Sequence, residues 1–414
     1  MQRRNFMVQS AAMAGWTLLP VAAAKAAQAA QDQQRRRKLV VVMLRGAVDG
    51  LSVVAPYAEP EYQAARGSIA LASPGEEGGA VKLSSLFGLH PALLKLKPMW
   101  DGGSLAFVHA SGSPDSTRSH FDAQDYLESG TPGRKSTPDG WMNRLLNDLP
   151  GPASPTRGVN MGATPPRIWA GNAAVATLGL GPRALDSKAI DGPRMQAALA
   201  RLYAQDPALA QALRESTEGR AGIQRSMDVK AMEADPDRGA PSASAFAADA
   251  WRLGQLIRLD AHTQLAFTSV GGWDTHINQG GASGQLANKL SSLGEGLAAL
   301  TLGLGEAMRD TVIVVCSEFG RTLKQNGSGG TDHGRGNVMW LLGGPVAGGR
   351  VLGEWPGLAS ADLADGRDLA VTTDFRQVFG ALLQRHLGLS DAGLAQVFPA
   401  LPGSWAQGAG LLRS

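Results

Sequence analysis

Acidic and imidazole side chains follow a buried strand in the last third of the chain, and their types suit metal chemistry. The run 312–315 is apolar and β-branched, which predicts a strand buried on both faces. This strand delivers Glu318 to its C-terminal end, and a Gly-rich loop then leads to Asp332 and His333. Carboxylates and imidazoles are ligands of divalent metals. Acid-rich loops after strands also occur without a metal, so this stretch alone leaves a metal site open.

A second pair of such residues follows another predicted strand. The strand expected over 264–270 ends in Gly-Gly-Trp-Asp-Thr-His, which contains Asp274 and His276. Side chains two residues apart on an extended loop can point to the same side, so both can reach one ion. The alternative is a turn, which aspartate also favours.

A third carboxylate, Asp49, follows the predicted strand 38–44. Its neighbour is Gly50, and an Asp-Gly pair is a common turn. In an open parallel sheet, however, ligands gather at the C-terminal ends of the strands. Both interpretations of Asp49 remain open at this point.

Hydroxyl and basic side chains gather at residues 116–120, Ser-Thr-Arg-Ser-His, before a helix predicted over 121–128. Ser119 with Asp122 three residues later fits a helix N-cap and its acidic first turn. Alternatively, a hydroxyl at a helix N-terminus can approach or attack a bound phosphate or sulfate, which leaves Ser116, Thr117 and Ser119 as candidates. Arg118 offers a planar guanidinium for a tetrahedral anion, or else forms a surface salt bridge.

Strands and helices alternate along the chain. Apolar strands at 38–44, 104–110 and 264–270 alternate with helices expected at 91–100, 246–260, 286–308 and 375–386. This order predicts a layered α/β fold with right-handed crossovers. We predict one domain over 38–400, a helical and loop insertion or cap over about 140–243, and a C-terminal tail over 401–414.

Composition excludes several classes of protein. The 414 residues carry 39 basic and 36 acidic side chains, so the net charge is only +3, and no long basic face accompanies it. We therefore expect no nucleic-acid binding. Cys316 is the one cysteine, which excludes an intramolecular disulfide and a Cys-rich zinc site.

Residues 1–29 are typical of a twin-arginine export signal. Arginines at positions 3 and 4 precede a moderately apolar run at 8–24 and small residues that suit cleavage after Ala26 or Ala29. An uncleaved membrane anchor is the alternative, but the run is short and interrupted by proline. A basic linker follows over 30–37. We therefore expect a periplasmic or otherwise exported protein that engages the twin-arginine machinery.

Four segments thus place polar side chains at the ends of predicted strands, which indicates one site at one edge of one sheet. Their motifs, LRGAVDGL, TRSHFDAQDYLESG, GGWDTH, SEFGRT and GTDHGRGN, together with the leader, resemble the exported domain-of-unknown-function family 1501. That family is a branch of the alkaline-phosphatase-like superfamily, which includes phosphatases and sulfatases. The resemblance spans nearly the whole mature chain and implies a three-layer α/β sandwich whose mostly parallel central sheet is flanked by helices.

The resemblance also implies a set of metal ligands. Asp332 is either a ligand or a partner that orients His333. The implied ligands and candidates are Asp49, Asp274, His276, Glu318, Asp332 and His333.

The motif departs from the superfamily at two adjacent positions. Glu318 replaces the usual aspartate, and Phe319 stands where a histidine ligand is usual. This substitution leaves one metal position short of a ligand, which implies one ion, a weakly held second ion, or no catalysis. The implied nucleophile lies at the head of the helix after the second strand, where Ser119 is preferred because it occupies the N-cap position.

Two functions follow from these residues. The first is an exported hydrolase of phosphate or sulfate esters that uses one or two Zn, Mn or Ca ions, with Ser119 or Thr117 as nucleophile and Arg118 and His120 as further catalytic groups. The second is a non-catalytic, sulfatase-like scaffold that binds metal, an anion or a periplasmic partner, such as a co-encoded exported protein of unknown function. Phe319 favours the second function and the full set of ligands favours the first.

Overall fold

The computed structural model describes residues 34, 36–151, 154, 156–181, 236–403 and 405–413. Its centre is a mixed sheet in which most neighbouring strands are parallel and only β10 runs against its neighbours. The order across the sheet is β11 (Arg350–Leu352), β5 (Leu105–Gly112), β10 (Asn337–Gly343), β9 (Thr311–Ser317), β1 (Lys38–Leu44), β8 (Leu265–Val270), β6 (Gly158–Met161) and β7 (Ala176–Leu178), with β12 (Thr373–Asp374) also paired to β5. The predicted mostly parallel sheet is confirmed.

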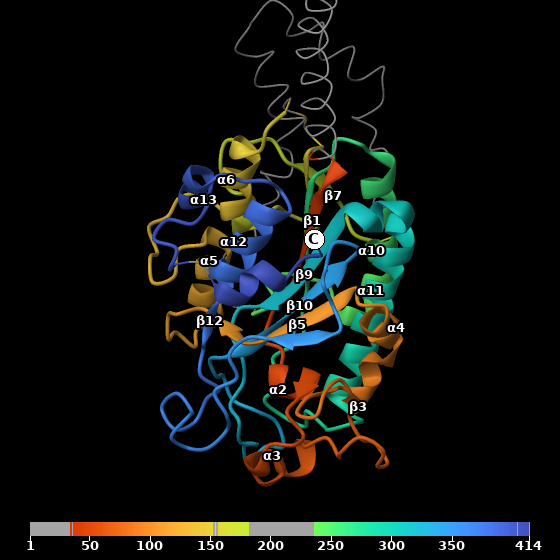
Figure 1. The fold of residues 1–414 in the computed structure, drawn as a ribbon, viewed down its shortest axis with the longest axis vertical. Helices are drawn as coiled ribbons and strands as arrows, with labels where there is room; N and C mark the ends of the chain where they lie inside the picture. The colour runs from red at the N-terminus through yellow and green to blue at the C-terminus, as the bar shows by residue number, and fades with distance from the viewer. Residues whose placement is uncertain are drawn as a thin grey trace, which may run out of the picture.

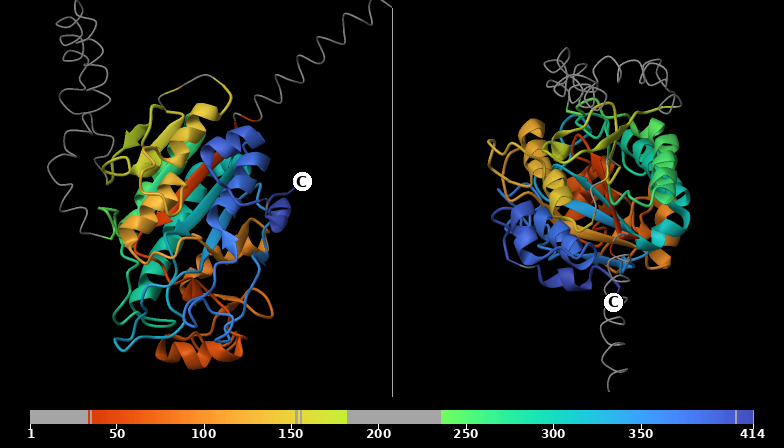
Figure 2. Two further views of the ribbon diagram at one scale, coloured as in Figure 1. Left: turned by 90° about the vertical axis from the view of Figure 1, so that its left-hand side faces the viewer. Right: turned by 90° about the horizontal axis from the view of Figure 1, so that it is seen from above.

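Helices cover both faces of this sheet, as Figures 1 and 2 show. One face carries α4 (Lys97–Asp101), α10 (Phe246–Leu259) and α11 (Gln285–Leu304), and the other carries α5 (His120–Ser129), α6 (Trp141–Asp148), α12 (Phe375–Arg385) and α13 (Asp391–Val397). The three-layer α/β sandwich is therefore confirmed.

The central strand β1 shows why the sheet must be covered twice. Its alternate residues Val40 and Val42 pack into the core under α10 and α11, while Val41 and Met43 pack into the core under α6 and α12. All seven β1 residues are buried. Successive side chains of a strand point to opposite faces, so a continuous apolar run can be buried only between two layers.

Helix ends follow local sequence signals, with two departures from the prediction. The helix expected over 286–308 ends at Leu304, because Gly305 takes φ +51° and the chain continues as the 3₁₀ segment η7 (Gly305–Asp310). The helix expected over 91–100 is divided into the 3₁₀ segment η2 (Pro91–Leu96) and α4. α12 begins, as expected, at Phe375, and its N-cap Asp374 forms a capping box with Gln377.

The segment expected as an insertion differs from that expectation where the structure describes it. Strands β6 and β7 extend the main sheet by pairing in parallel beyond β8, so residues 158–161 and 176–178 belong to the central layer. Short extended runs of four and three residues gave little periodicity by which to recognise them. Residues 182–235 of the same segment lie outside the described residues, as do the expected signal over 1–29 and most of the linker over 30–37.

The C-terminal segment over 401–414, expected as a tail, packs on the domain instead. It forms the 3₁₀ segment η8 (Ala406–Gly410), and Leu411 is fully buried in the core beneath α12. The backbone amide of Arg413 donates to the carbonyl of Pro345 at 2.8 Å. Among the described residues, no helix has the length and apolarity to cross a bilayer.

A small three-stranded sheet lies beyond the C-terminal ends of the main strands. It consists of β2 (Val54–Ala55), β4 (Gly88–Leu89) and β3 (Val81–Lys82); α2 (Gly50–Val53) precedes β2, and α3 (Pro60–Arg66) lies between β2 and β3 in the chain. Figure 1 shows α2 and α3 below the main sheet, at the end where the β1 chain leaves it. This subdomain was not predicted, and it carries Arg66 to the end of β1.

Two buried histidines tie this subdomain to the sheet. His109 on β5 donates from Nε2 to the Val54 carbonyl at 2.9 Å, and its Nδ1 accepts from the Ala110 amide. His90 makes the equivalent pair of contacts with the Gly281 carbonyl and the Ala92 amide. Burial lowers the pKa of each imidazole to about 4, so both are neutral when folded.

We expect these histidines to make stability fall with acidification below pH 6.5. The unfolded chain takes up a proton on each near pH 6.5, whereas the folded chain resists it down to about pH 4, so each costs about 1.4 kcal/mol per pH unit across that window. Urea unfolding at pH 7, 6 and 5 measures how the free energy of unfolding changes with pH. His109→Gln should reduce this slope by the equivalent of about one proton taken up on unfolding. An unchanged slope would contradict the assignment.

Candidate metal centre

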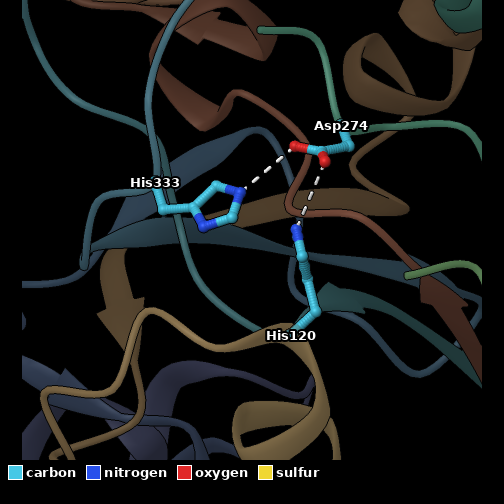
Figure 3. A group of neighbouring side chains, drawn as sticks. All are labelled: His120, Asp274 and His333. Carbon is cyan, nitrogen blue, oxygen red and sulfur yellow. Dashed lines mark hydrogen bonds and ion pairs between the residues drawn. The ribbon is translucent and has the colours of Figure 1, made fainter. Parts of the chain in front are cut away.

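The carboxylate of Asp274 is the hub of a cluster of imidazoles. His333 Nε2 lies 3.2 Å from Asp274 Oδ1, and His120 Nε2 lies 3.5 Å from Asp274 Oδ2. One ligand atom from each of the three residues lies within 4.8 Å of the other two, as Figure 3 illustrates. The three come from separate parts of the chain, and together they form a metal-ligating type of cluster.

The sheet topology explains why distant segments meet here. Asp274 follows β8, and Glu318 directly follows β9, which is parallel to the same central strand. His333 precedes β10, and β10 is antiparallel to β9, so its beginning lies at the edge where β8 and β9 end. The segments that carry Asp274, Glu318 and His333 therefore meet at one edge of the sheet.

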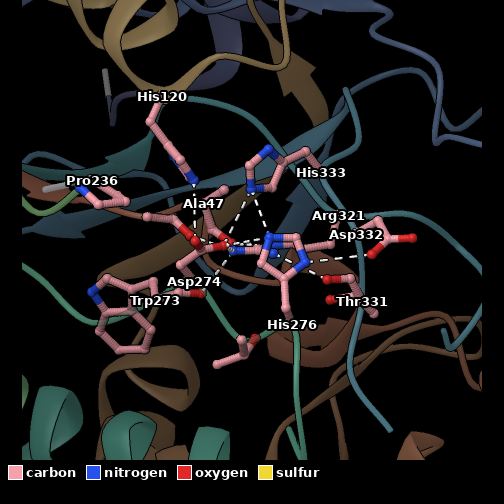
Figure 4. A network of polar contacts seen from close by, with 12 residues as sticks. Ala47, His120, Pro236, Trp273, Asp274, His276, Arg321, Thr331, Asp332 and His333 are labelled. Carbon is pink, nitrogen blue, oxygen red and sulfur yellow. Dashed lines mark hydrogen bonds and ion pairs between the residues drawn. The ribbon is translucent and has the colours of Figure 1, made fainter. Parts of the chain in front are cut away.

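His276 adds a third imidazole on the more open side of the cluster. Its Nε2 lies 2.9 Å from His333 Nε2 and 3.0 Å from Asp274 Oδ1. Its side chain is 37% exposed, whereas that of His120 is 6% exposed. Figure 4 shows the imidazoles of the three histidines around the Asp274 carboxylate. The Asp-Thr-His spacing does bring its two outer residues to one place.

Each of the three imidazoles is held through its other ring nitrogen. Nδ1 of His120 lies 2.8 Å from Glu318 Oε1, Nδ1 of His333 lies 2.8 Å from the Arg118 carbonyl, and Nδ1 of His276 lies 3.4 Å from Asp332 Oδ1. An oxygen partner at Nδ1 fixes the ring orientation and leaves Nε2 facing the centre, which is how metal-ligating histidines are normally supported. All three Nε2 atoms therefore converge on Asp274.

The structure places Glu318 and Asp332 behind histidines rather than within the cluster. Glu318 is fully buried, and its Oε1 accepts from His120, from the Gly46 amide at 2.8 Å and from Gln124 at 3.0 Å. Burial by itself would raise the pKa of Glu318, but His120 and the Gln124 hydrogen bond bring it to about 2. Asp332, 57% exposed, orients His276 and not His333.

His120 holds a position that the sequence did not assign to it. Burial would lower the pKa of His120, yet Asp274 and Glu318 on its two sides raise it to about 9. Its Nε2 is buried and has no hydrogen-bond partner. A side chain expected among the catalytic groups therefore lies within the candidate ligand set, and its place at the first residue of α5 was the available signal.

Arg321, to which the sequence assigned no role, supplies a buried positive charge. Its Nη2 donates to Asp274 Oδ1 at 2.5 Å and to the Gly46 carbonyl at 2.6 Å, and its Nε donates to the Ala47 carbonyl at 2.7 Å. Although burial opposes ionisation, His120, His333 and Arg321 hold the pKa of Asp274 far below its usual range. Asp274 is therefore ionised at neutral pH.

Phe319 forms the apolar wall of the cluster. Its ring stacks on His120, with centroids 4.9 Å apart, and lies 5.0 Å from the ring of His333. The residue that stands in place of an expected histidine thus fixes two imidazoles by packing. His120, the first residue of α5, places an imidazole directly against this ring.

Asp49 lies outside this cluster, contrary to the expectation that it ligates the metal. It forms a fully buried ion pair with Arg66, and it accepts from Ser52 at 2.8 Å and from Gln279 at 2.6 Å. Arg66 and the hydrogen bonds lower the pKa of Asp49 against the opposing effect of burial. The positive charge beside Asp49 is therefore the guanidinium of Arg66.

Gly46, three residues before Asp49, contributes its backbone amide and carbonyl to the site. Gly46 takes φ +105°, and a Cβ there would lie 2.8 Å from the backbone nitrogen of Asp274. Its amide binds Glu318 and its carbonyl binds Arg321. The close approach requires glycine, since only glycine combines this φ with the absence of a side chain.

The hydroxyls at 116–119 act as local caps. Ser119 is the N-cap of α5 and accepts from the Asp122 amide at 3.5 Å, and Thr117 Oγ1 accepts from the Ser119 amide at 3.2 Å, while Ser116 is exposed. The guanidinium of Arg118 is paired with Asp368 at 2.6 Å and with Asp365 at 3.0 Å. The capping and salt-bridge alternatives therefore account for the observed contacts of all three polar groups.

A family profile described as "Protein of unknown function (DUF1501)" matches residues 107–399, which is more than half of the chain. The chain belongs to this family. A search of curated proteins found no match.

Among solved structures, the chain is similar to the PsFucS1 sulfatase from Pseudoalteromonas sp., with 13% identity, a TM-score of 0.42 and coverage of 95% of this chain and 75% of that one. It is also similar to the C-terminal periplasmic domain of EcEptC from Escherichia coli, with 11% identity, a TM-score of 0.40 and coverage of 89% and 88%. A third similar structure is the phosphonate monoester hydrolase of Agrobacterium radiobacter, with 11% identity, a TM-score of 0.35 and coverage of 90% of this chain and 79% of that one. Similarity at this level does not assign a reaction to this chain.

The elevated pKa of His120 can be measured directly in metal-free protein. Titration of ¹³C-labelled histidines by NMR should show one imidazole that loses its proton near pH 9. Glu318→Gln removes one of the two flanking negative charges, so the pKa should fall by at least one unit. A His120 pKa near 6.5 in the wild-type protein would show that the two carboxylates do not act on this ring as described.

Proposed function

We propose that this family member is a metal-dependent hydrolase of phosphate or sulfate esters. The observation that carries the proposal is the convergence of three imidazole Nε2 atoms on one carboxylate, each with its Nδ1 held by an oxygen. Structural ion pairs rarely need three separately oriented histidines, whereas metal centres do.

The donor set fits a transition metal. His120 Nε2 is a buried polar atom without a hydrogen-bond partner and lies 3.5 Å from Asp274 Oδ2, so an ion that displaced its proton would contact both groups. Three nitrogens and one carboxylate suit zinc or manganese better than calcium, which prefers an all-oxygen shell. The proposed ligands are His120, Asp274, His276 and His333. We propose a single ion, because Arg66 already neutralises Asp49.

Charge at the site favours an anionic substrate. Asp274 and Glu318 carry two negative charges, which Arg321 and a divalent ion would more than balance. A net positive centre at an open edge of the sheet attracts phosphate and sulfate esters. The bound ion would polarise the ester oxygen as a Lewis acid. Arg321 fixes the orientation of Asp274, and Phe319 excludes water from one side of the imidazoles.

The attacking group in this proposal is water. Ser119 and Thr117 use their hydroxyls as acceptors for the backbone at the start of α5, which favours their structural role. Export through the twin-arginine pathway and association with a co-encoded exported protein remain proposals that rest on the leader and the family resemblance.

Elemental analysis of the purified protein tests the ion. We expect about one zinc or manganese per chain and a loss of most of it in His333→Ala, because one of the oriented nitrogens is removed. His386→Ala is the matched control, since His386 is bonded to the Lys38 carbonyl at the other end of β1. Equal metal content in both variants would contradict the assigned ligands.

The hydrolase itself is tested with a panel of phosphate, phosphonate and sulfate esters. We expect turnover that depends on added metal and is abolished in His333→Ala. Ser119→Ala should keep turnover and lose about 1 kcal/mol of stability, as the loss of an N-cap does. Loss of turnover in a folded, metal-loaded Ser119→Ala protein would instead identify Ser119 as the nucleophile.

One observation favours the non-catalytic alternative. Arg321 already pairs with Asp274 at 2.5 Å, and His120 can be protonated at neutral pH, so the cluster can balance its charges without an ion. A protein that takes up no metal and turns over none of the esters would be a scaffold of this kind.

A further inference from the structure

A second concentration of charge lies at the opposite edge of the sheet from the candidate metal centre. A pocket of about 440 Å³ is lined by four arginines, Arg37, Arg309, Arg385 and Arg413, and by one carboxylate, Asp310. It lies where β1 and β9 begin, since Arg37 precedes Lys38 and Asp310 precedes Thr311. Strands of seven residues separate the two edges by about 20 Å. The pocket is therefore separate from the proposed hydrolase site.

Two of these arginines are fixed in place by backbone carbonyls. Arg37 Nη1 donates to the carbonyl of His386 at 2.9 Å, at the C-terminal end of α12. Arg413 donates from Nε to the Val346 carbonyl at 3.0 Å and from Nη2 to the Gly103 carbonyl at 2.6 Å. These contacts hold each guanidinium by one side. In the described part of the chain, Nη2 of Arg37 and Nη1 of Arg413 have no assigned partner.

The other two arginines, like Arg413, are exposed, whereas Arg37 is half-buried. Arg309 lies in η7, and Arg385 is the last residue of α12. Within the described ranges, none of the four guanidiniums lies within 4.0 Å of a carboxylate, whereas the buried Arg45, Arg66 and Arg321 are each paired with one. His386, which also lines the pocket, is neutral because burial lowers its pKa to about 4.

We propose that this pocket binds a phosphate- or sulfate-type oxyanion. Four arginines against one aspartate give a local surplus of positive charge, and gathering like charges is unfavourable unless an anion relieves it. Guanidinium groups match tetrahedral oxyanions because their planar N–H pairs donate in a bidentate manner. Arg37 and Arg413, already oriented by backbone carbonyls, would bind the anion together with Arg309 and Arg385, which also line the pocket.

The oxyanion that this pocket binds can come from two sources, a free anion in solution or the anionic headgroup of a lipid at a membrane surface. The exposed Arg36 precedes the pocket in the chain, so its charge adds to this edge of the protein. A concave pocket suits a discrete group rather than a flat surface, and either source presents such a group. The experiment below distinguishes them.

Calorimetric titration with inorganic phosphate and with sulfate, at constant ionic strength set with chloride, measures binding to the whole protein. The double variant Arg309→Gln/Arg385→Gln should weaken binding at least fivefold, because two of the four charges are removed while the carbonyl contacts of Arg37 and Arg413 remain. Lys82→Gln, an exposed cation on β3 near the other edge, is the control and should bind like the wild type. Anion bound at the metal centre contributes equally to all three proteins.

Sedimentation with vesicles of phosphatidylglycerol, compared with phosphatidylcholine, tests the headgroup source. Vesicle binding lost in the double variant supports the site with a lipid headgroup as its ligand, and phosphate binding alone supports a free anion. The proposal is overturned if the wild type, the double variant and Lys82→Gln bind phosphate, sulfate and vesicles equally, or if none of the probes binds to the wild type.

Discussion

The arrangement at the C-terminal edge of the sheet depends on the charge of one carboxylate. Asp274 is contacted by three imidazoles and one buried guanidinium, which together keep it ionised although much of it is removed from water. An isolated carboxylate in this position would be costly to bury. The surrounding loops supply the groups that face Asp274, and position 46 requires glycine because its backbone lies against Asp274 while it binds Glu318 and Arg321.

The support for this carboxylate extends inward through a buried polar chain. Glu318 links His120 to Gln124, and Gln124 accepts from Arg45, which in turn forms a buried ion pair with Glu128 at 2.7 Å. Breaking one member would leave an unpaired buried charge, which is far more costly than never having the pair. The imidazole of His120 is thus positioned by the core of the protein, whereas His276 is positioned by the exposed Asp332.

The sequence allowed the sheet, and the edge that carries the candidate site, to be predicted, because both depend on local patterns. Apolar runs identified β1, β8 and β9, and the polar residues that follow them identified the edge. Pairings between distant side chains left no local pattern. Nothing near Asp49 shows that Arg66 neutralises it, and nothing near Glu318 shows that it contacts His120 across 198 positions. The short strands β6 and β7 were missed because three or four residues carry too little periodicity.

Phe319 occupies the position where the family resemblance implies a histidine, and the structure shows what its ring contacts instead. The absence of a histidine there suggested a deficient site, but the phenylalanine ring stacks on His120 and packs against His333. The number of imidazoles at the centre depends on which elements reach it in space, and α5 reaches it through its first residue.

In the proposed function, the imidazoles of His120, His276 and His333 ligate one ion together with Asp274. X-ray absorption at the zinc edge on zinc-loaded protein tests it most directly, since imidazole rings give multiple-scattering features that carboxylates and water do not. We expect about three imidazole nitrogens and one oxygen as ligands, with zinc–nitrogen distances of about 2.0–2.1 Å. A shell composed of oxygen alone, or a zinc ion that gives the same spectrum in His333→Ala, would contradict this assignment.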